Sequence, residues 1–500
     1  MKKNNIIWCL FLVLPCAMII YCASLVPLTA PFNGLNPFTG NGTNKLALIR
    51  AIATNTSEIV SLIDPPNSLT SDEIPTAATD EKDIVSLTDP PAGVVAANGD
   101  GTDETDVIQA IFDYATKANK TILIPKNYTF VVDNIYIGNK NHFSILGYGT
   151  LKHKNGATNA ILDIENCSNF YIDTLNTNGN VANNKTDGQR LNEDLASVQI
   201  IQSHDFKIDT INDKNPAGDS LYLNDVDNAS IGTLSATAKK PSGRNALTII
   251  KAQDVTIDKV LSQNIGVPTM PSGICLEPNS CSDDIENVVI KSAEIKTSGM
   301  YGCAVGNHAL ANVNHIEINA NITRDGTPDG TLFVLNHVDN FKGNITCNQE
   351  GTIAYGAVIT ACNYVDANLE IYNSITGLDV GKNSSNINLT GKIIGTAKNG
   401  MEIYEGLSQG VIDMDIKQVA QEDSQSGVIR ISPGQAIDNL TFKGDYSFDK
   451  TGGYCFRVDW QMTNCRTEDL NMSGWTAKNM TTGADAGTLA INNDTPSRVT

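Results

Sequence analysis

The residues of this chain that combine acid–base chemistry with a regular spacing lie between positions 215 and 310. Carboxylates, a guanidinium, a phenol and an imidazole recur there at intervals that suit successive turns of a repeating fold. Such groups hold and move protons in general acid–base catalysis. The candidate catalytic residues are Asp219, Tyr222, Arg244 and Glu277, and the candidate substrate-binding residues are Asn245 and His308.

Two reactions on a polysaccharide fit these residue types. Lysis or C5-epimerisation of a uronic acid polymer needs a cation for the carboxylate and groups that transfer protons. Arg244 suits the first role, and Tyr222 or His308 suits the second. Hydrolysis instead needs two carboxylates that flank the scissile bond, and Asp219 with Glu277 would form that pair. The residue types leave both reactions open, and each of these residues would also serve as an ordinary turn or surface residue.

A repeating pattern of short strands must position these groups. From residue 160 onward, a short strand, a polar turn and another short strand recur, with one apolar position at intervals of 20 to 36 residues. A period in that range, built of β-branched strands, predicts a solenoid whose coils stack about 4.8 Å apart. We therefore predict an all-β, right-handed parallel β-helix of about 12 coils. The repeated apolar positions are Ile172, Ile208, Ile231, Ile257, Ile290, Ile316, Phe341, Leu369, Leu389, Ile412, Leu440 and Leu470.

The segment before the repeats predicts a cap. Turn and acidic residues at 98–106 precede apolar residues at helical spacing from Val107 to Ala115, and a strand pattern begins at Thr121. A helix there would cover the first coil and protect its open edge. Residues 29–94 are rich in Pro, Thr, Ser and Asn and predict a stalk or linker, so the β-helix domain is expected at 95–500. Within the stalk, the sequence of 58–66 recurs almost unchanged at 83–91.

The first 28 residues predict export. Lys2 and Lys3 precede an apolar run from Ile6 to about Leu28, which is typical of a signal peptide or an uncleaved signal anchor. We expect a secreted, periplasmic or cell-surface protein, attached to the membrane if the segment is not cleaved.

Eight of the 11 cysteines lie beyond that segment, and an exported protein allows disulfides. The short spacings of Cys275 with Cys281 and of Cys455 with Cys465 would permit two small loops. We expect the other four to be buried in the core; these are Cys167, Cys303, Cys347 and Cys362.

The charge limits the partners. Fifty-five acidic against 35 basic residues give a net charge of −20, which argues against a nucleic-acid partner. A polyanionic substrate would need bridging cations or a local basic cluster. No cofactor is implied with certainty; calcium is compatible with the chain, and Asp283 and Asp284 are candidate ligands for it.

The organisation resembles the pectin-lyase-like superfamily of right-handed β-helices, over about residues 95 to 480. The opening segment Asn98-Gly-Asp-Gly-Thr-Asp-Glu-Thr-Asp106 is similar to that of secreted and phage tailspike members. Three stretches resemble a bacterial β-helix group more specifically: Gly218-Asp-Ser-Leu-Tyr-Leu, Gly243-Arg-Asn-Ala-Leu-Thr-Ile and Ser272-Gly-Ile-Cys-Leu-Glu-Pro-Asn279. In that group, glycines stand where this chain has Ser220 and Ala246, and an aspartate stands where it has Cys275.

The resemblance implies a protein that acts on a polysaccharide in a groove on the side of the β-helix. Its members include polysaccharide lyases, glycoside hydrolases and C5-epimerases, so an enzyme of one of these kinds is the first expectation. A non-catalytic carbohydrate-binding or surface-adhesion protein is the alternative, because an acidic group is lost at Cys275. A tailspike-like depolymerase is a third, and it would be consistent with a homo-oligomer.

Overall fold

The computed structural model describes residues 83–184, 194–266, 273–297, 299–306, 309–325, 330–419, 427–432 and 437–448, with short stretches at 454–458, 462–463, 465–472, 481–482 and 490–491. The chain divides into two compact units, 1–65 and 66–500, and all described residues belong to the second. The predicted export segment and most of the predicted stalk therefore lie outside the described residues, as does His308.

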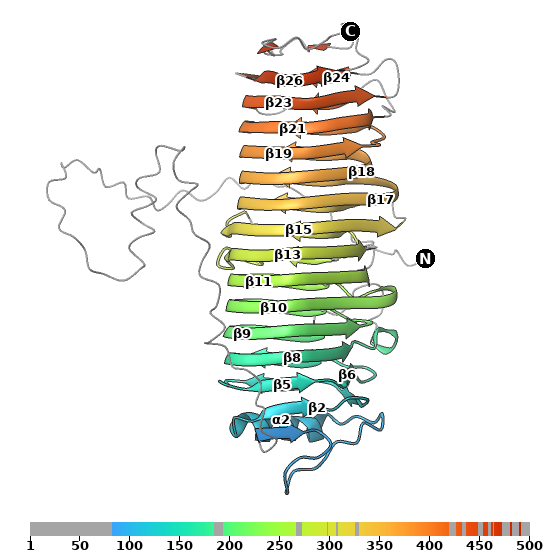
Figure 1. The fold of residues 1–500 in the computed structure, drawn as a ribbon, viewed down its shortest axis with the longest axis vertical. Helices are drawn as coiled ribbons and strands as arrows, with labels where there is room; N and C mark the ends of the chain where they lie inside the picture. Colours follow the sequence, from blue (N-terminus) through green and yellow to red (C-terminus); the bar gives the residue numbers. More distant parts are fainter. Residues whose placement is uncertain are drawn as a thin grey trace, which may run out of the picture. The chain divides into compact units, whose positions relative to one another are not determined.

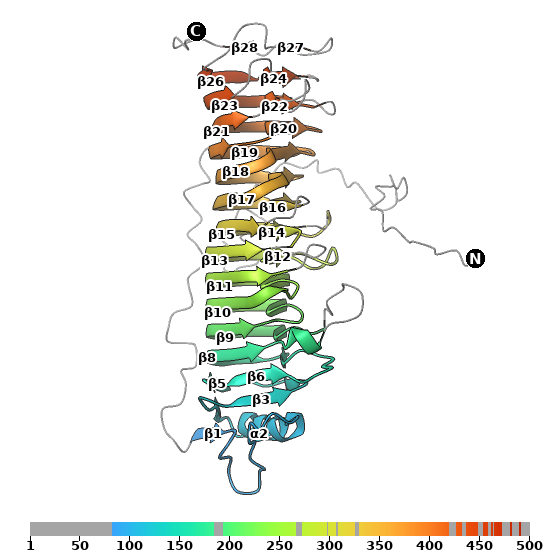
Figure 2. The same ribbon diagram turned by 90° about the vertical axis from the view of Figure 1, so that its right-hand side faces the viewer.

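The described residues form a parallel β-solenoid of about 11 turns, which confirms the predicted fold class (Figure 1). Twenty-eight strands join one continuous ladder, and every strand pairing is parallel. Each coil contributes strands to different sides of the solenoid, as the turned view shows for β12 beside β13 and β20 beside β21 (Figure 2). A coil therefore pairs with the coils before and after it rather than with itself.

The cap and the first coils consist of β1 (Ile84–Ser86), α2 (Thr105–Lys117), β2 (Thr121–Ile124), β3 (Thr129–Val132), β4 (Ile135–Gly138), β5 (Ser144–Gly147), β6 (Thr150–His153), β7 (Leu162–Glu165), β8 (Ser168–Asn178) and the 3-10 helix η2 (Val181–Asn183). The middle coils consist of β9 (Val198–Lys214), β10 (Leu221–Ser242), β11 (Leu247–Ile265), β12 (Ile274–Leu276), β13 (Ile285–Thr297), β14 (Tyr301–Val305), β15 (Val313–Asp325), β16 (Thr331–Asn336) and β17 (Asp339–Thr360). The last coils consist of β18 (Asn363–Gly381), β19 (Ser384–Ile394), β20 (Asn399–Tyr404), β21 (Leu407–Val419), β22 (Gly427–Ile431), β23 (Ile437–Phe448), β24 (Tyr454–Val458), β25 (Met462–Thr463), β26 (Arg466–Met472), β27 (Thr481–Thr482) and β28 (Ala490–Ile491).

The core is a column of stacked aliphatic and aromatic side chains. All twelve repeated apolar positions are buried, and the first five are direct register partners from Ile172 to Ile290. The next aligned residue, Ile316, pairs with Val288 rather than Ile290. This two-residue slip keeps the side chain on the inner face, because strand side chains alternate with a period of two. An inward-facing pattern of apolar residues therefore predicts which residues are buried more reliably than it predicts which residues pair between coils.

Asparagines and aspartates stack at the polar turn between strand segments. Each adopts a positive φ near 50°, a conformation that these short polar side chains tolerate. Their side chains bond from coil to coil: Asn228 Nδ2 donates to Asp205 Oδ1 at 2.5 Å, and Asn287 Nδ2 donates to Asp254 Oδ1 at 2.8 Å. The Asn-rich composition is thus explained by the turns.

Helix α2 closes the first end of the solenoid, as predicted. It contacts β2 and β4 and buries Ile108, Ile111, Phe112 and Ala115. The Glu104 carboxylate does not cap the helix; its oxygens accept hydrogen bonds from the backbone N–H groups of Asn98 and Gly99, at 2.5 to 3.1 Å.

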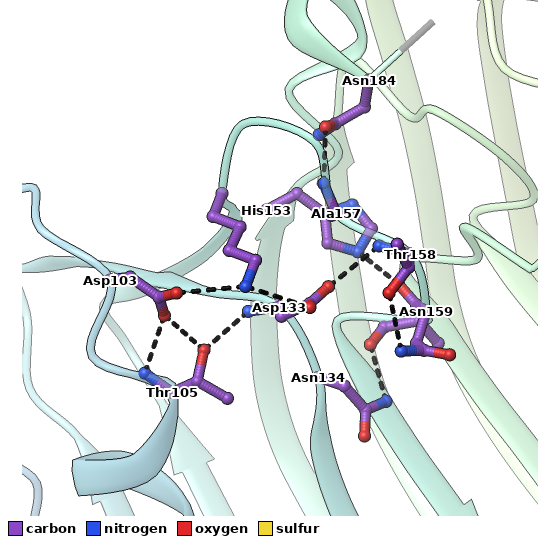
Figure 3. Close-up of polar contacts among 11 residues, drawn as sticks. Asp103, Thr105, Asp133, Asn134, His153, Ala157, Thr158, Asn159 and Asn184 are labelled. Atoms are coloured by element: carbon purple, nitrogen blue, oxygen red, sulfur yellow. Dashed lines mark hydrogen bonds and ion pairs between the residues drawn. The ribbon is translucent and has the colours of Figure 1, made fainter. Parts of the chain in front are cut away.

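Polar contacts tie the cap to the following coil (Figure 3). Lys154 Nζ lies 3.1 Å from both Asp103 Oδ2 and Asp133 Oδ2, and the Asp133 backbone N–H donates to Thr105 Oγ1 at 2.9 Å. One lysine therefore joins the segment before α2 to the strands that follow it.

Residues before the predicted boundary at residue 95 also belong to the solenoid. Strand β1 lies within the segment predicted to be a stalk, and it pairs in parallel with β2. Val85 and Leu87 belong to the core. The second copy of the repeated motif, at 83–91, supplies this strand, because its alternating aliphatic residues extend the sheet edge by one strand.

The cysteines in the described residues are free thiols. Cys167, Cys303, Cys347 and Cys362 are buried in the core, as predicted. The proposed link between Cys275 and Cys281 does not form, because Cys275 is buried on the wall and Cys281 is exposed. Cys465 is also free, whereas the side chain of Cys455 lies outside the described residues. No helix among the described residues is long and apolar enough to span a bilayer.

Candidate functional site

One row of side chains runs along the outer face of the wall and connects the candidate residues. Each member is the register partner of the next on the following coil. Residues on either side of a member, such as Ile274 and Leu276, point into the core. We call this the outer row: Tyr222, Thr248, Cys275, Ala304, Val334, Val358, Asp379, Glu402 and Arg430.

The sequence-predicted residues gather at the first half of the outer row. The coils bring Asp219, Arg244 and Asn245 to one place, with the outer-row residues Thr248 and Cys275 beside them. Glu277 follows β12 directly, and Tyr301 begins β14 on the next coil. We call these seven residues the Asp219 cluster.

Asp219 lies at the centre of this cluster and is fully buried. Its Oδ1 accepts a hydrogen bond from the backbone N–H of Asn245 at 3.0 Å, and its Oδ2 accepts one from the Thr248 hydroxyl at 2.9 Å. Arg244 Nη1 lies 3.4 Å from Oδ2. The predicted proximity of Asp219, Arg244 and Asn245 is therefore confirmed. Asp219 was predicted as a catalytic candidate or a turn residue; its carboxylate is enclosed by its own donors and holds the turn.

Glycines make this turn possible. Gly243, before Arg244, has a φ of +76°, and a Cβ there would lie 2.8 Å from Pro216 Cγ. Gly273, before β12, has a φ of +82°, and a Cβ there would lie 2.0 Å from the carbonyl oxygen of Gly302. Two of the stretches that carry the resemblance thus contain glycines that the local backbone requires.

Electrostatics in the Asp219 cluster favour neutral groups. Burial raises the pKa of Asp219, while the nearby Arg244 guanidinium acts in the opposite direction. Burial and the charge of Glu277 raise the pKa of the Cys275 thiol well above its ordinary value. The thiol donates to Glu277 Oε2 at 2.7 Å, so it is a hydrogen-bond donor and not a thiolate nucleophile.

Glu277 and Tyr301 form the more open side of the cluster. Both are half-buried. Burial raises the pKa of Tyr301, and the proximity of Cys275 and Glu277 raises it further. Tyr222, two coils before Cys275 on the outer row, is also half-buried. Glu277, Tyr222 and Tyr301 are therefore the members of this region that remain within reach of a ligand.

In the described part of the chain, the candidate calcium ligands Asp283 and Asp284 do not belong to a larger cluster of metal-binding side chains. No group of three or more His, Cys, Asp or Glu side chains is arranged there to hold a metal ion. Asp283 and Asp284 occupy the turn before β13, where the backbone N–H of Asn312 donates to Asp284 Oδ1 at 3.1 Å. This contact connects two successive turns.

A second polar cluster lies further along the same row and was missed from the sequence. Asp379 and Glu402 are direct register partners on β18 and β20, and Arg430 is the next partner on β22. Tyr355 and Tyr404 lie beside them, and burial together with the charges of Asp379 and Glu402 raises the pKa of both tyrosines. Asn399 and Ser432 donate to Glu402. We call these seven residues the Asp379 cluster.

The carboxylates of this cluster have different surroundings. Glu402 Oε1 lies 3.2 Å from Arg430 Nη1 and accepts from the Ser432 hydroxyl at 2.5 Å, while Oε2 accepts from Asn399 Nδ2 at 3.2 Å. Asp379 has no such support: its Oδ1 is buried without a hydrogen-bond partner. Burial and the adjacent charge of Glu402 raise the pKa of Asp379 to about 7, with a further contribution from Glu405, while the nearby Lys382 acts in the opposite direction.

A sequence signal for this cluster exists. Gly377-Leu-Asp-Val and Gly400-Met-Glu-Ile repeat the arrangement of Gly273-Ile-Cys-Leu, with one outward residue between two buried aliphatic residues. An acidic residue at that outward position on two successive coils marks the pair. The signal is visible only after the coils are aligned in correct register.

No protein-family model matches the sequence, and no curated protein matches it significantly. Solved structures with a similar course of the chain include an exopolygalacturonase from Thermotoga maritima, at 12% identity and a TM-score of 0.38, covering 80% of this chain and 94% of that one. Another is the A-module of a mannuronan C-5 epimerase from Azotobacter vinelandii, at 13% identity and a TM-score of 0.37, covering 82% and 98%. A third is a tailspike protein variant of E. coli bacteriophage HK620 in complex with a pentasaccharide, at 11% identity and a TM-score of 0.45, covering 81% and 78%. These are β-helix proteins of the broad group that the sequence resembles, and the likeness concerns the fold.

Proposed function

We propose that this chain is an exported protein that binds and processes a polysaccharide along the outer row of its β-solenoid. The observation that carries the proposal is the arrangement of Tyr301 and Tyr355. They lie in one register row two coils apart, on β14 and β17, which corresponds to about 10 Å. Both are half-buried; Tyr301 lies beside the carboxylate of Glu277, and Tyr355 lies beside the outer-row carboxylates of Asp379 and Glu402.

Half-buried tyrosines beside carboxylates suit an extended sugar chain. An aromatic face stacks on the apolar side of a sugar ring, and a carboxylate accepts hydrogen bonds from its hydroxyls. Ala304, Val334 and Val358 form a smooth stretch of the row between the two clusters. The wall therefore offers repeated contacts at a constant spacing, as a linear polymer requires. The apolar run behind Lys2 and Lys3 supports delivery to the outside, where such polymers are found.

A non-catalytic carbohydrate-binding protein is the second candidate. The complete burial of Asp219 favours it, because that carboxylate is unavailable for chemistry, and so does the thiol of Cys275, which stands where the bacterial β-helix group that the sequence resembles has an aspartate. Under this alternative, the outer row would bind a polymer without cleaving it.

The test is a screen of the full chain against pectate, alginate, hyaluronan and neutral glycans, with and without calcium. Affinity electrophoresis would detect binding, ultraviolet absorbance would detect the unsaturated product of a lyase, and reducing ends would detect a hydrolase. NMR spectra of the polymer would detect an epimerase. We expect binding to at least one polymer, weakened by Tyr301→Ala and by Tyr355→Ala. Binding without turnover would establish the second candidate, and binding to none would overturn the proposal.

A further inference from the structure

The Asp379 cluster has the composition of a reaction centre. Two carboxylates lie side by side on adjacent coils, on the outer face, with a guanidinium on one side and tyrosines nearby. The side chains of Glu402 and Arg430 are 21% and 18% exposed, so they are accessible but largely shielded from water. Two adjacent carboxylates repel each other, so an ordinary solvent-exposed surface gains no stability from such a pair.

The hydrogen bonds divide the two carboxylates by role. Glu402 receives donors from Arg430, Ser432 and Asn399, which fix its orientation and stabilise its negative charge. Asn399 is fully buried, and its hydrogen bond to Glu402 helps to fix the orientation of that carboxylate. Asp379 instead has a buried oxygen with no hydrogen-bond partner and faces the charge of Glu402. A carboxyl group in that position keeps its proton, as a general acid must.

The spacing also restricts the mechanism. Register partners on adjacent parallel strands lie about 4.8 Å apart, and side chains on one face keep roughly that separation. Carboxyl groups about 5 to 5.5 Å apart are typical of glycosidases that retain the anomeric configuration, whereas inverting enzymes need about 6.5 to 9.5 Å to admit a water molecule. Two carboxyl groups on neighbouring coils therefore favour a mechanism that retains the anomeric configuration.

We propose that Asp379 and Glu402 are the general acid/base and the nucleophile of a retaining glycoside hydrolase centre on this wall. This inference rests on the proposed function and assigns its reaction and residues. The substrate class is a polysaccharide whose scissile glycosidic oxygen lies over Asp379 and whose anomeric carbon lies over Glu402. Tyr355, one coil before Asp379, would carry the adjoining sugar ring.

The two steps balance with one molecule of water. In the first, a Glu402 oxygen attacks the anomeric carbon, the glycosidic C–O bond breaks, and the Asp379 proton passes to the leaving oxygen. In the second, the Asp379 carboxylate takes a proton from water, whose oxygen attacks the anomeric carbon and releases Glu402. The second inversion at that carbon restores its original configuration, and Asp379 is again protonated.

The first experiment requires no substrate. The full chain is labelled with [γ-13C]aspartate, and the Asp379 signal is assigned by its loss in Asp379→Asn. We expect its NMR titration midpoint near 7 in the wild type, and a lower midpoint in Glu402→Gln, because the adjacent negative charge is removed. A wild-type midpoint near the ordinary value of 3.8 would overturn the acid role.

The second experiment measures turnover and stereochemistry on pectate, alginate, hyaluronan and neutral glycans. We expect Asp379→Asn and Glu402→Gln each to lower the release of reducing ends at least 100-fold, and the first product to carry the anomeric configuration of the substrate in 1H NMR. The matched control is Asp366→Asn, an exposed aspartate on the same strand β18, which should leave turnover unchanged. Circular dichroism and melting temperature would verify that the variants fold.

The outcomes separate this inference from the function on which it rests. Turnover that survives in both variants, or a product of inverted configuration, would overturn the retaining pair while the polysaccharide function stands. An unsaturated product would do the same by showing a lyase. Failure to bind any polymer in the affinity screen, before any variant is made, would overturn the proposed function itself.

Discussion

The Asp219 cluster and the Asp379 cluster occupy the same outer row, about four coils apart, and differ in what surrounds their carboxylates. Asp219 is completely buried, and hydrogen-bond donors satisfy both of its oxygens. Asp379 is half-buried, one of its oxygens has no partner, and its register neighbour is another carboxylate. The first arrangement stabilises a turn, whereas the second raises the pKa of one carboxyl group beside another carboxylate.

Under the proposed assignment, a conspicuous sequence motif and the reaction centre lie on one wall without coinciding. Gly243-Arg-Asn is conspicuous in sequence because its tight turn needs the glycine, and Gly218-Asp-Ser is conspicuous because the Asp219 carboxylate accepts the hydrogen bonds that hold this turn. Asp379 and Glu402 are less conspicuous, although close packing also requires the glycines two residues before them, Gly377 and Gly400. Four predictions would break or sharpen this distinction.

The largest expected effect is on turnover. Glu402→Gln should lower the cleavage rate on the order of 100- to 10,000-fold, the usual contribution of a group that acts directly in acid–base or nucleophilic catalysis. Glu277→Gln should change it less than 10-fold, since Glu277 lies in the other cluster. Reducing-end assays on the polymer that the wild type cleaves would measure both, and the reverse ranking would assign the chemistry to the Asp219 cluster.

The next effect is on stability. Asp219→Ala should lower the free energy of unfolding by about 3–5 kcal/mol, because it removes the buried carboxylate that pairs with Arg244 and accepts the hydrogen bond of the Thr248 hydroxyl. Asp379→Ala should cost less than about 1 kcal/mol, since it removes a group with an unsatisfied oxygen. Urea unfolding followed by circular dichroism would compare them. Equal losses would contradict the division into a structural and a chemical carboxylate.

A smaller effect concerns pH. The pKa of Asp379 is raised from 3.8 to about 7 in the folded chain, so the unfolded chain releases this proton more readily. The folded state is therefore favoured below pH 4 and loses that advantage as the pH rises from 4 to 7. Asp379→Asn should remove this loss and stabilise the chain at pH 8 by on the order of 1–3 kcal/mol, allowing for partial exposure. Melting temperatures of both proteins from pH 4 to pH 8 would reveal it, and parallel curves would contradict the shifted pKa.

The smallest effect is on binding. Tyr355→Ala and Tyr301→Ala should each weaken affinity for the bound polymer about 3- to 10-fold, the range expected from losing one aromatic contact of about 1 kcal/mol. Phenylalanine at either position should retain most of the affinity, because the ring face is kept. Isothermal titration calorimetry with oligosaccharides would measure this, and an unchanged affinity at Tyr355 alone would confine the polymer to the Asp219 end.

The fold was predictable because the period-two alternation of apolar residues survives small errors in register. Ile316 was aligned two residues away from its true partner and was still correctly predicted to be buried. Helix α2 was predictable from Ile108, Ile111 and Phe112, whose spacing defines one helical face. Strand β1 was missed because three residues, Ile84–Ser86, are too short to show a period within a polar segment.

The site was predictable only in part. Proximity of Asp219, Arg244 and Asn245 followed from their equivalent places on successive coils. The burial of Asp219 did not follow, since it depends on neighbours such as Thr248 that belong to the next coil. Asp379 and Glu402 lie 23 positions apart and become neighbours only through a register that sequence spacing fixes to within two residues.

The parallel stacking of the coils has a consequence for selectivity. The contacts along the outer row repeat at the fixed interval of about 4.8 Å set by backbone hydrogen bonds, and a continuous ladder of this kind cannot stretch or compress to suit a ligand. A polymer whose monomer length is commensurate with that interval would present every ring to the wall in the same phase. A polymer of different pitch would drift out of phase within a few residues, so the protein would discriminate by periodicity as well as by the chemistry of single sugars.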